Sequence, residues 1–153
     1  MNLFPWKKEI DFFSVEEKAR ILVAIKKAEQ QTSGEVRHFI ESHCRFVDAL
    51  DRAKEIFFNL RMEQTKERNG VLIYIAVKDH QAAIFGDEGI HEKVGKKYWA
   101  DEIQKMLLYF KQHHLTDGIC QVVHDIGEAL QFYFPYDEYT DKNELPDDIV
   151  FGR

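Results

Sequence analysis

The chain has 153 residues and a mass of 18.1 kDa, which is the size of one ordinary domain with its own core. Hydrophobic residues make up 44% of the chain and charged residues 31%, a composition that excludes a disordered protein. The net charge of −6 argues against a nucleic-acid partner, because phosphate backbones are bound by basic surfaces. No stretch approaches the roughly 20 apolar residues of a membrane helix, and the first residues lack the apolar core of a signal peptide. We therefore expect a cytoplasmic monomer with no membrane partner.

The first predicted element is a helix that begins after Ser14. The sequence Ser14-Val15-Glu16-Glu17 is a capping box, in which the serine and the second glutamate each accept a hydrogen bond from a backbone N–H. Apolar residues at helical spacing follow, and the helix is expected to end at Thr32-Ser33-Gly34. Residues 35–41 then predict a short strand. A second helix is expected to follow, with one buried face formed by Val47, Leu50, Lys54, Phe57 and Leu60.

The central part of the sequence predicts a hairpin. Arg68-Asn69-Gly70 is a turn, and residues 71–77 are seven consecutive apolar or aromatic side chains, which is typical of a strand buried on both faces. A polar turn at 78–81 leads into the partner strand at 82–85. Three helices are expected afterwards: a short one near residues 90–94 and two longer ones, of which the last is stopped by Pro135.

This element order predicts an α/β fold. Strand, helix and strand in succession give a parallel pair with a right-handed crossover, and the hairpin adds an antiparallel strand. Because the middle strand is apolar throughout, helices must cover both faces. We therefore predict a three-layer α/β/α sandwich around a small mixed sheet in residues 1–135. Residues 136–153 form an acidic tail, which we expect to dock on the domain through Leu145, Ile149 and Phe151.

The predicted topology also brings polar residues together. The starts of two parallel strands lie at the same end of a sheet, and the hairpin returns the end of the third strand to that end. Gly34-Glu35, Asn69-Gly70 and the segment 86–89 should therefore meet. Carboxylate and carbonyl oxygens in turns are what a hard cation such as calcium requires. The alternative is that the glycines only form turns and the acids are only solvated.

Other constellations give no catalytic signature. The sequence contains no glycine-rich nucleotide loop and no Gly-x-Ser-x-Gly elbow. Glu88-x-x-His91 lacks the second such pair that a di-iron site needs. His124 and Glu128 are interpreted as a surface pair, and His113-His114 as the end of a helix. Cys44 and Cys120 are expected to stay reduced.

Three blocks of the sequence resemble the core of the TPM-domain family, in particular its short stand-alone bacterial members. They are Ser33-Gly34-Glu35-Val36-Arg37, then residues 68–73 beginning Arg68-Asn69-Gly70, and residues 84–90 with Gly86-Asp87-Glu88-Gly89; the tail segment 143–147 is also similar. The resemblance implies an α/β/α sandwich that binds a divalent cation, usually discussed as calcium, in loops at one end of the sheet. The residues it designates as metal ligands are Glu35, Asp87 and Glu88, with Asn69 and Asp101 as weaker candidates.

The resemblance leaves two functions open, because family members have little in common in their roles. The first is a cation-binding domain without catalysis that interacts with, or regulates, a protein partner. The alternative is a metal-assisted phosphatase for small phosphomonoesters, in which the cation would polarise phosphoryl oxygens. In that reading Arg37 binds the anionic substrate; in the other it pairs with a carboxylate.

Overall fold

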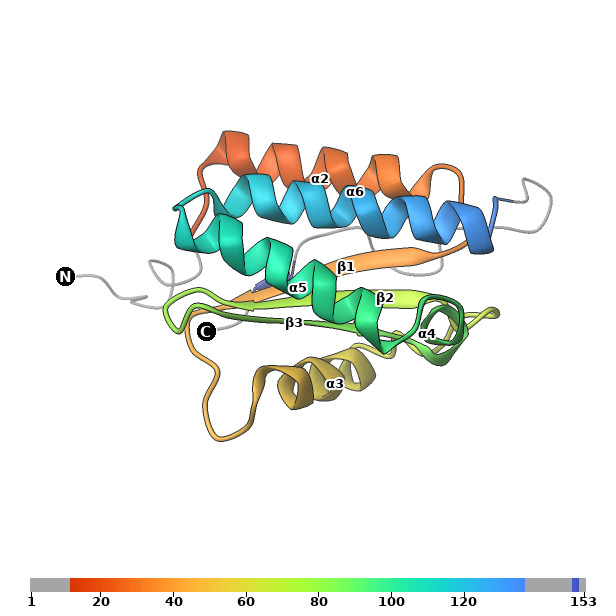
Figure 1. Ribbon diagram of the computed structural model, residues 1–153, viewed down its shortest axis with the longest axis horizontal. Helices are drawn as coiled ribbons and strands as arrows, with labels where there is room; N and C mark the ends of the chain where they lie inside the picture. The colour runs from red at the N-terminus through yellow and green to blue at the C-terminus, as the bar shows by residue number, and fades with distance from the viewer. Residues whose placement is uncertain (1–11, 137–149, 152–153) are drawn as a thin grey trace.

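The computed structural model describes residues 12–136 and, for the backbone alone, Val150 and Phe151. The order of helix, strand, helix, two strands and three helices is the expected one (Figure 1). In chain order the elements are α2 (Val15–Glu29), β1 (Glu35–Glu41), α3 (Ala49–Asn59), β2 (Gly70–Ala76), β3 (Gln81–Gly86), α4 (Glu88–Val94), α5 (Lys96–Lys111), α6 (Leu115–Tyr133) and β4 (Val150–Phe151).

The sheet has the strand order β3-β2-β1-β4. β1 and β2 are parallel, with Glu35 opposite Gly70, and β2 and β3 are antiparallel, with Val71 opposite Gly86. All seven residues of β2 are buried, as its apolar sequence predicted. The mixed sheet is therefore confirmed, and β3 forms one of its outer edges.

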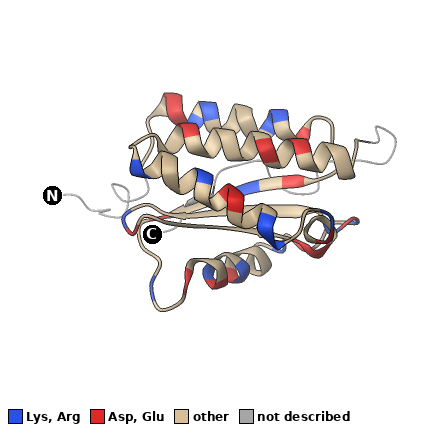
Figure 2. Cartoon of the chain, viewed as in Figure 1, with Lys and Arg blue, Asp and Glu red and all other residues tan. Residues whose placement is uncertain are grey.

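Two hydrophobic cores separate three layers, which confirms the α/β/α sandwich. In Figure 1, α2, α5 and α6 lie on one side of the sheet and α3 lies on the other. The larger core joins Val71, Ile73 and Ile75 to the side with three helices, and the smaller joins Leu72, Tyr74 and Phe57 to α3. Charged residues are spread over helices and loops, with few on the strands (Figure 2).

The helix α2 begins as its sequence indicates. Ser14 Oγ accepts a hydrogen bond from the Glu17 N–H at 3.1 Å, and Glu17 Oε1 accepts one from the Ser14 N–H at 2.9 Å. This reciprocal pair is the predicted capping box.

The buried face of α3 differs from the predicted one. The helix begins at Ala49, after Val47, and packs Ala53, Ile56 and Phe57 against the sheet. Phe57 is buried as predicted and Leu60 is partly buried, but Leu50 is 45% exposed and Lys54 is exposed as well, so the predicted face was only partly right. The reason is that residues i, i+3 and i+4 from Ala53 already form the apolar stripe that contacts β2 and β3. Leu50 and Lys54 lie beside that stripe.

A fourth strand, which the sequence did not predict, comes from the tail. The backbone of Val150–Phe151 pairs in parallel with Phe39 and Ile40 of β1. Leu145 and Ile149 lie outside the described residues, so docking of the whole tail stays a prediction.

Candidate functional site

The three segments that topology predicted to meet do meet at one end of the sheet. Glu35 is opposite Gly70, and the N–H of Asp87 donates to the carbonyl of Gly70 at 2.9 Å. The N–H of Glu35 also reaches the carbonyl of Asn69, at 3.5 Å. We call Glu35, Asn69 and Asp87 the strand-end cluster.

Glu35 and Asp87 lie on the same face of the sheet. Side chains alternate between faces along a strand, and Leu72 and Phe85 both pack on the α3 side. Glu35, Gly70 and Asp87 therefore form a row across three strands on that side. Adjacent strands are about 4.8 Å apart, so the two carboxylates start from backbones roughly 10 Å apart, with no side chain on the glycine between them.

The carboxylate of Asp87 already makes two kinds of contact in this structure. It is the N-cap of α4, and its Oδ1 accepts from the Glu88 N–H at 2.8 Å. Its carboxylate also takes two bonds from Arg68, Nε to Oδ2 at 2.7 Å and Nη2 to Oδ1 at 2.8 Å. Such paired bonds are the strong form of an arginine–carboxylate contact, and the bond to Asp87 raises the pKa of Arg68.

Arg68 is the site residue that sequence reasoning missed. Its backbone has φ of 51°, which is uncommon for a residue with a side chain, and Nη1 also contacts Glu88 Oε1 at 3.3 Å. The sequence signal that could have identified Arg68 was the segment Arg68-Asn69-Gly70, which was interpreted only as a turn. Glu88 is mostly exposed, at 68% of its side-chain surface, and therefore lies at the rim of the cluster.

Asn69 carries the unusual feature of the cluster. The residue is 1% exposed, its Nδ2 donates to Ser33 Oγ at 3.1 Å, and its Oδ1 has no hydrogen-bond partner among the described residues. Two further buried oxygens of the same loop, Glu63 Oε2 and Thr65 Oγ1, also have none there. Buried oxygen acceptors are normally satisfied, so this end of the sheet holds oxygens suited to a cation.

The remaining predicted residues lie in different places. Arg37 follows Glu35 on the same face of β1 and is 9% exposed. Asp101 lies on the exposed surface of α5, where it pairs with Lys97 at 3.1 Å. It does not join the strand-end cluster.

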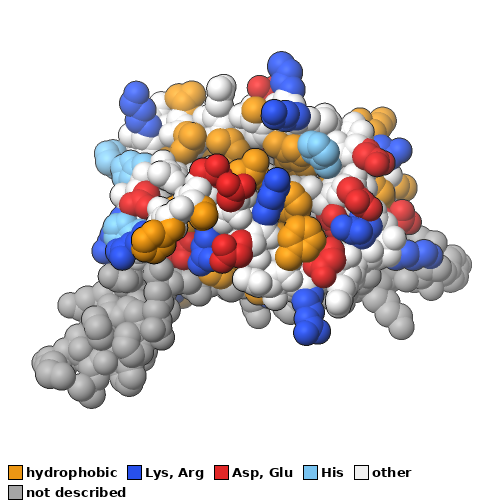
Figure 3. Space-filling view, turned by 90° about the horizontal axis from the view of Figure 1, so that it is seen from below, with side chains coloured by type: hydrophobic (Ala, Val, Ile, Leu, Met, Phe, Trp, Pro, Cys, Tyr) orange, Lys and Arg blue, Asp and Glu red, His pale blue; other side chains and the backbone are white. Residues whose placement is uncertain are grey.

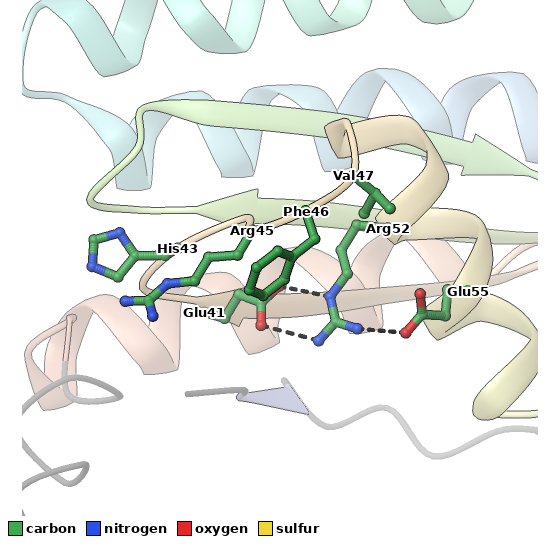
Figure 4. A pocket seen from close by; sticks show the side chains of 7 residues that line it. All are labelled: Glu41, His43, Arg45, Phe46, Val47, Arg52 and Glu55. Atoms are coloured by element: carbon green, nitrogen blue, oxygen red, sulfur yellow. Dashed lines mark hydrogen bonds and ion pairs between the residues drawn. The ribbon is translucent and has the colours of Figure 1, made fainter.

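A second polar site lies at the opposite end of β1 (Figure 4). It is a pocket of about 490 Å³ in which Arg52 holds the buried carboxylate of Glu41 at 2.9 and 3.1 Å and also bonds Glu55 at 2.8 Å. The hydroxyl of Tyr74 donates to Glu41 from β2. Figure 4 shows the Phe46 ring beside this pair, and Phe46 is fully exposed. Sequence reasoning missed the pair because its members come from different elements.

The histidine pairs are structural or exposed. His124 Nε2 lies 2.9 Å from Glu128 Oε1 on the surface of α6, which confirms the predicted surface pair. His91 accepts a hydrogen bond from the Trp99 indole at 3.0 Å. Within the described part of the chain, no three acidic, histidine or cysteine side chains gather closely enough to hold a metal by themselves. A cation at the strand-end cluster would therefore depend on neutral oxygens as well as carboxylates, which calcium accepts.

The fold and the cluster define an α/β/α domain with acidic and amide side chains buried where three strand ends meet. The TPM-domain profile matches residues 7–129. The chain belongs to the TPM-domain family, which confirms the resemblance seen in the sequence.

Two solved structures are similar to the chain. The NMR structure of the BA42 protein from the psychrophilic bacterium Bizionia argentinensis has 40% sequence identity and a TM-score of 0.84, covering 93% of this chain and 97% of that chain. The N-terminal domain of the cg2496 protein from Corynebacterium glutamicum has 14% identity and a TM-score of 0.59, covering 78% and 74%, and shows the fold alone. A comparison with curated proteins gave no match.

None of the helices in residues 12–136 is long and apolar enough to span a bilayer.

Proposed function

We propose that this protein is a binding domain without catalysis that holds a divalent cation, calcium in first place, at the strand-end cluster. The observation that carries the proposal is the burial of the cluster: Asn69 is 1%, Asp87 2% and Glu35 3% exposed. A bare cation can reach oxygens at that depth, whereas a phosphate ester requires an open pocket. Burial therefore favours ion binding over the phosphatase alternative.

The proposed ligands are Asn69 Oδ1 and the carboxylate of Glu35, with Asp87 joining when Arg68 releases it. Arg68 supplies the positive charge next to Asp87 in this structure, so a cation and Arg68 would compete for one carboxylate. That competition predicts moderate affinity, because part of the binding free energy replaces an existing ion pair. Glu88 remains at the rim, and Asp101 has no part in the site.

The test is thermal unfolding with and without calcium. Binding only to the folded state stabilises it by about 2.7 kcal/mol at a hundredfold excess over Kd. For a chain of this size that is roughly 5–10 °C in Tm. Asn69→Ala removes the unpartnered oxygen and should abolish the calcium shift; because it also loses the bond to Ser33, it should melt below wild type in EDTA. Asp101→Asn is the matched control and should keep the full shift.

Two results would contradict the proposal. One is a wild-type Tm that does not change at millimolar calcium; the other is an equal calcium shift in Asn69→Ala. NMR titration locates the ion, and the amides of 34–36, 69–70 and 86–90 should move first. An aryl phosphate assay on the calcium-loaded protein is expected to give no rate above background; a rate abolished by Asp87→Asn would support the phosphatase instead.

A further inference from the structure

A groove runs along the outer edge of the sheet, between α3 and α5. It has a volume of about 750 Å³, and its floor is residues 82–86 of β3. Both helices contact β3, and Figure 1 shows them on opposite sides of the sheet, below and above that strand. Leu50 and Phe58 form the α3 wall, and Trp99, Ala100 and Ile103 form the α5 wall.

The floor presents unpaired backbone groups. In an antiparallel ladder, alternate residues bond the neighbouring strand, and those between them point away. The bond from the Asp87 N–H to the Gly70 carbonyl sets this alternation, so Phe85, Ala83 and Gln81 face β2. The N–H and C=O groups of Ala82, Ile84 and Gly86 therefore point into the groove. Among the described residues no hydrogen bond involves these groups.

Both walls are apolar, the α3 wall is exposed, and positive charge lies on each side of the groove. Phe58 is 48% and Leu50 45% exposed, and Figure 3, which views the α3 side, shows hydrophobic side chains among charged ones on this face. Lys54 lies over the Phe85 ring at 5.9 Å, and Lys96 lines the opposite wall. Neither lysine forms an ion pair in the described part of the chain. Two acids, Asp87 and Glu88, lie at the end of the groove, and Arg68 pairs with both of them.

We propose that this groove binds an extended segment of a partner protein, which adds to the sheet as a strand beside β3 and carries both apolar and acidic side chains. Backbone bonds to Ala82, Ile84 and Gly86 supply register, and alternate side chains of the segment contact the two walls. Acidic side chains complement Lys54 and Lys96. A second copy of this domain fits less well, because its own flanking helices would meet α3 and α5 before the two edges could pair.

The proposal is independent of the cation, so the experiment is done in EDTA. The probe is a fluorescein-labelled peptide of ten residues that combines valine and phenylalanine with three aspartates. Its binding to the full chain is followed by fluorescence anisotropy. A second peptide of the same sequence carries N-methyl groups on alternate amides, which block strand pairing and leave the side chains intact.

The unmodified peptide should bind, and the N-methylated peptide should bind at least tenfold more weakly. Lys54→Glu with Lys96→Glu should weaken binding at least tenfold, whereas Lys111→Glu, outside the groove on α5, should leave it unchanged. Phe58→Ser should weaken peptide binding. Leu108 is 58% exposed and lies outside the groove, so Leu108→Ser should leave peptide binding unchanged. All of these positions are exposed, so folding should be retained, and the Tm of each variant checks it.

Three results would overturn the inference. They are no binding of the peptide, equal binding of the N-methylated peptide, and a concentration-dependent dimer in sedimentation that Ala82→Pro disrupts. The last would show that the edge is covered by a second copy. Addition of the peptide should instead shift the NMR signals of Ala82, Ile84, Gly86 and the two walls, and shifts confined to these residues would support peptide binding in the groove.

Discussion

Replacing Gly89 with alanine tests how the strand-end cluster is assembled. Gly89 lies in the first turn of α4, and its N–H donates to the carbonyl of Arg68 at 2.8 Å. A Cβ placed there would lie 2.1 Å from the backbone oxygen of Glu67 and 2.6 Å from that of Arg68. Backbone atoms cannot rotate away as a flexible side chain can. The helix must therefore withdraw by about 1 Å from the loop that holds Arg68 and Asn69.

The magnitude follows from three contributions. Overpacking costs about 1–3 kcal/mol and occasionally more, and the lost hydrogen bond adds about 1 kcal/mol. The higher helix propensity of alanine returns about 1 kcal/mol. The expected net loss for Gly89→Ala is about 1–3 kcal/mol in the free energy of unfolding, or roughly 2–12 °C in Tm.

The loss in the free energy of unfolding is measured by urea unfolding of Gly89→Ala beside a control variant. The control is Gly95→Ala: its Cβ meets nothing within 4 Å, but its φ of +82° strains a side chain, which costs about 1–2 kcal/mol. Gly89→Ala should be at least as destabilised as the control, because its cost comes from a clash with backbone oxygens and not from φ. If it unfolds at the same urea concentration as wild type, the close packing of α4 on residues 67–68 is wrong.

Two further predictions concern buried charge. Arg52→Met removes the arginine from the carboxylate of Glu41, which is 4% exposed, and should lower the free energy of unfolding in urea by about 2–4 kcal/mol. Adding Glu41→Gln should recover part of that loss. Strictly additive effects of the two substitutions would show that the pair is not coupled. Burial, and then the neighbouring Asp125, raises the pKa of Glu102 to about 7. Its contribution to stability is therefore full below the unfolded pKa of 4.5 and is lost as the pH rises through 7. The Tm of wild type should fall between pH 4.5 and pH 7, whereas the Tm of Glu102→Gln should not. Parallel Tm profiles of the two proteins would refute the raised pKa of Glu102.

The fold followed from local sequence signals wherever one signal was decisive. The capping box at Ser14 placed the start of α2, and the unbroken apolar run of β2 required helices on both faces. The face of α3 was misjudged, because its sequence carries apolar residues on more than one side. Phe58 and Leu50 satisfy helical spacing as well as Ile56 does, and only the position of β3 decides which are covered. The strand β4 was missed because a two-residue pairing leaves no periodic pattern.

The candidate site was predicted in its location but not in its electrostatics. Strand order alone brings Glu35 and Asp87 to one end of the sheet, so topology was sufficient for that step. The position of Arg68 was not accessible in the same way, because the sequence does not show that a residue in a turn adopts a positive φ and directs its guanidinium back to an N-cap. Three carboxylates in sequence suggested an excess of negative charge that a cation must balance. The structure shows that Arg68 pairs with both Asp87 and Glu88, and that among the described residues one of the unsatisfied buried oxygens belongs to Asn69, a neutral residue. If a cation binds the strand-end cluster as proposed, it competes with Arg68 for Asp87, so its occupancy should depend on how firmly Arg68 is held.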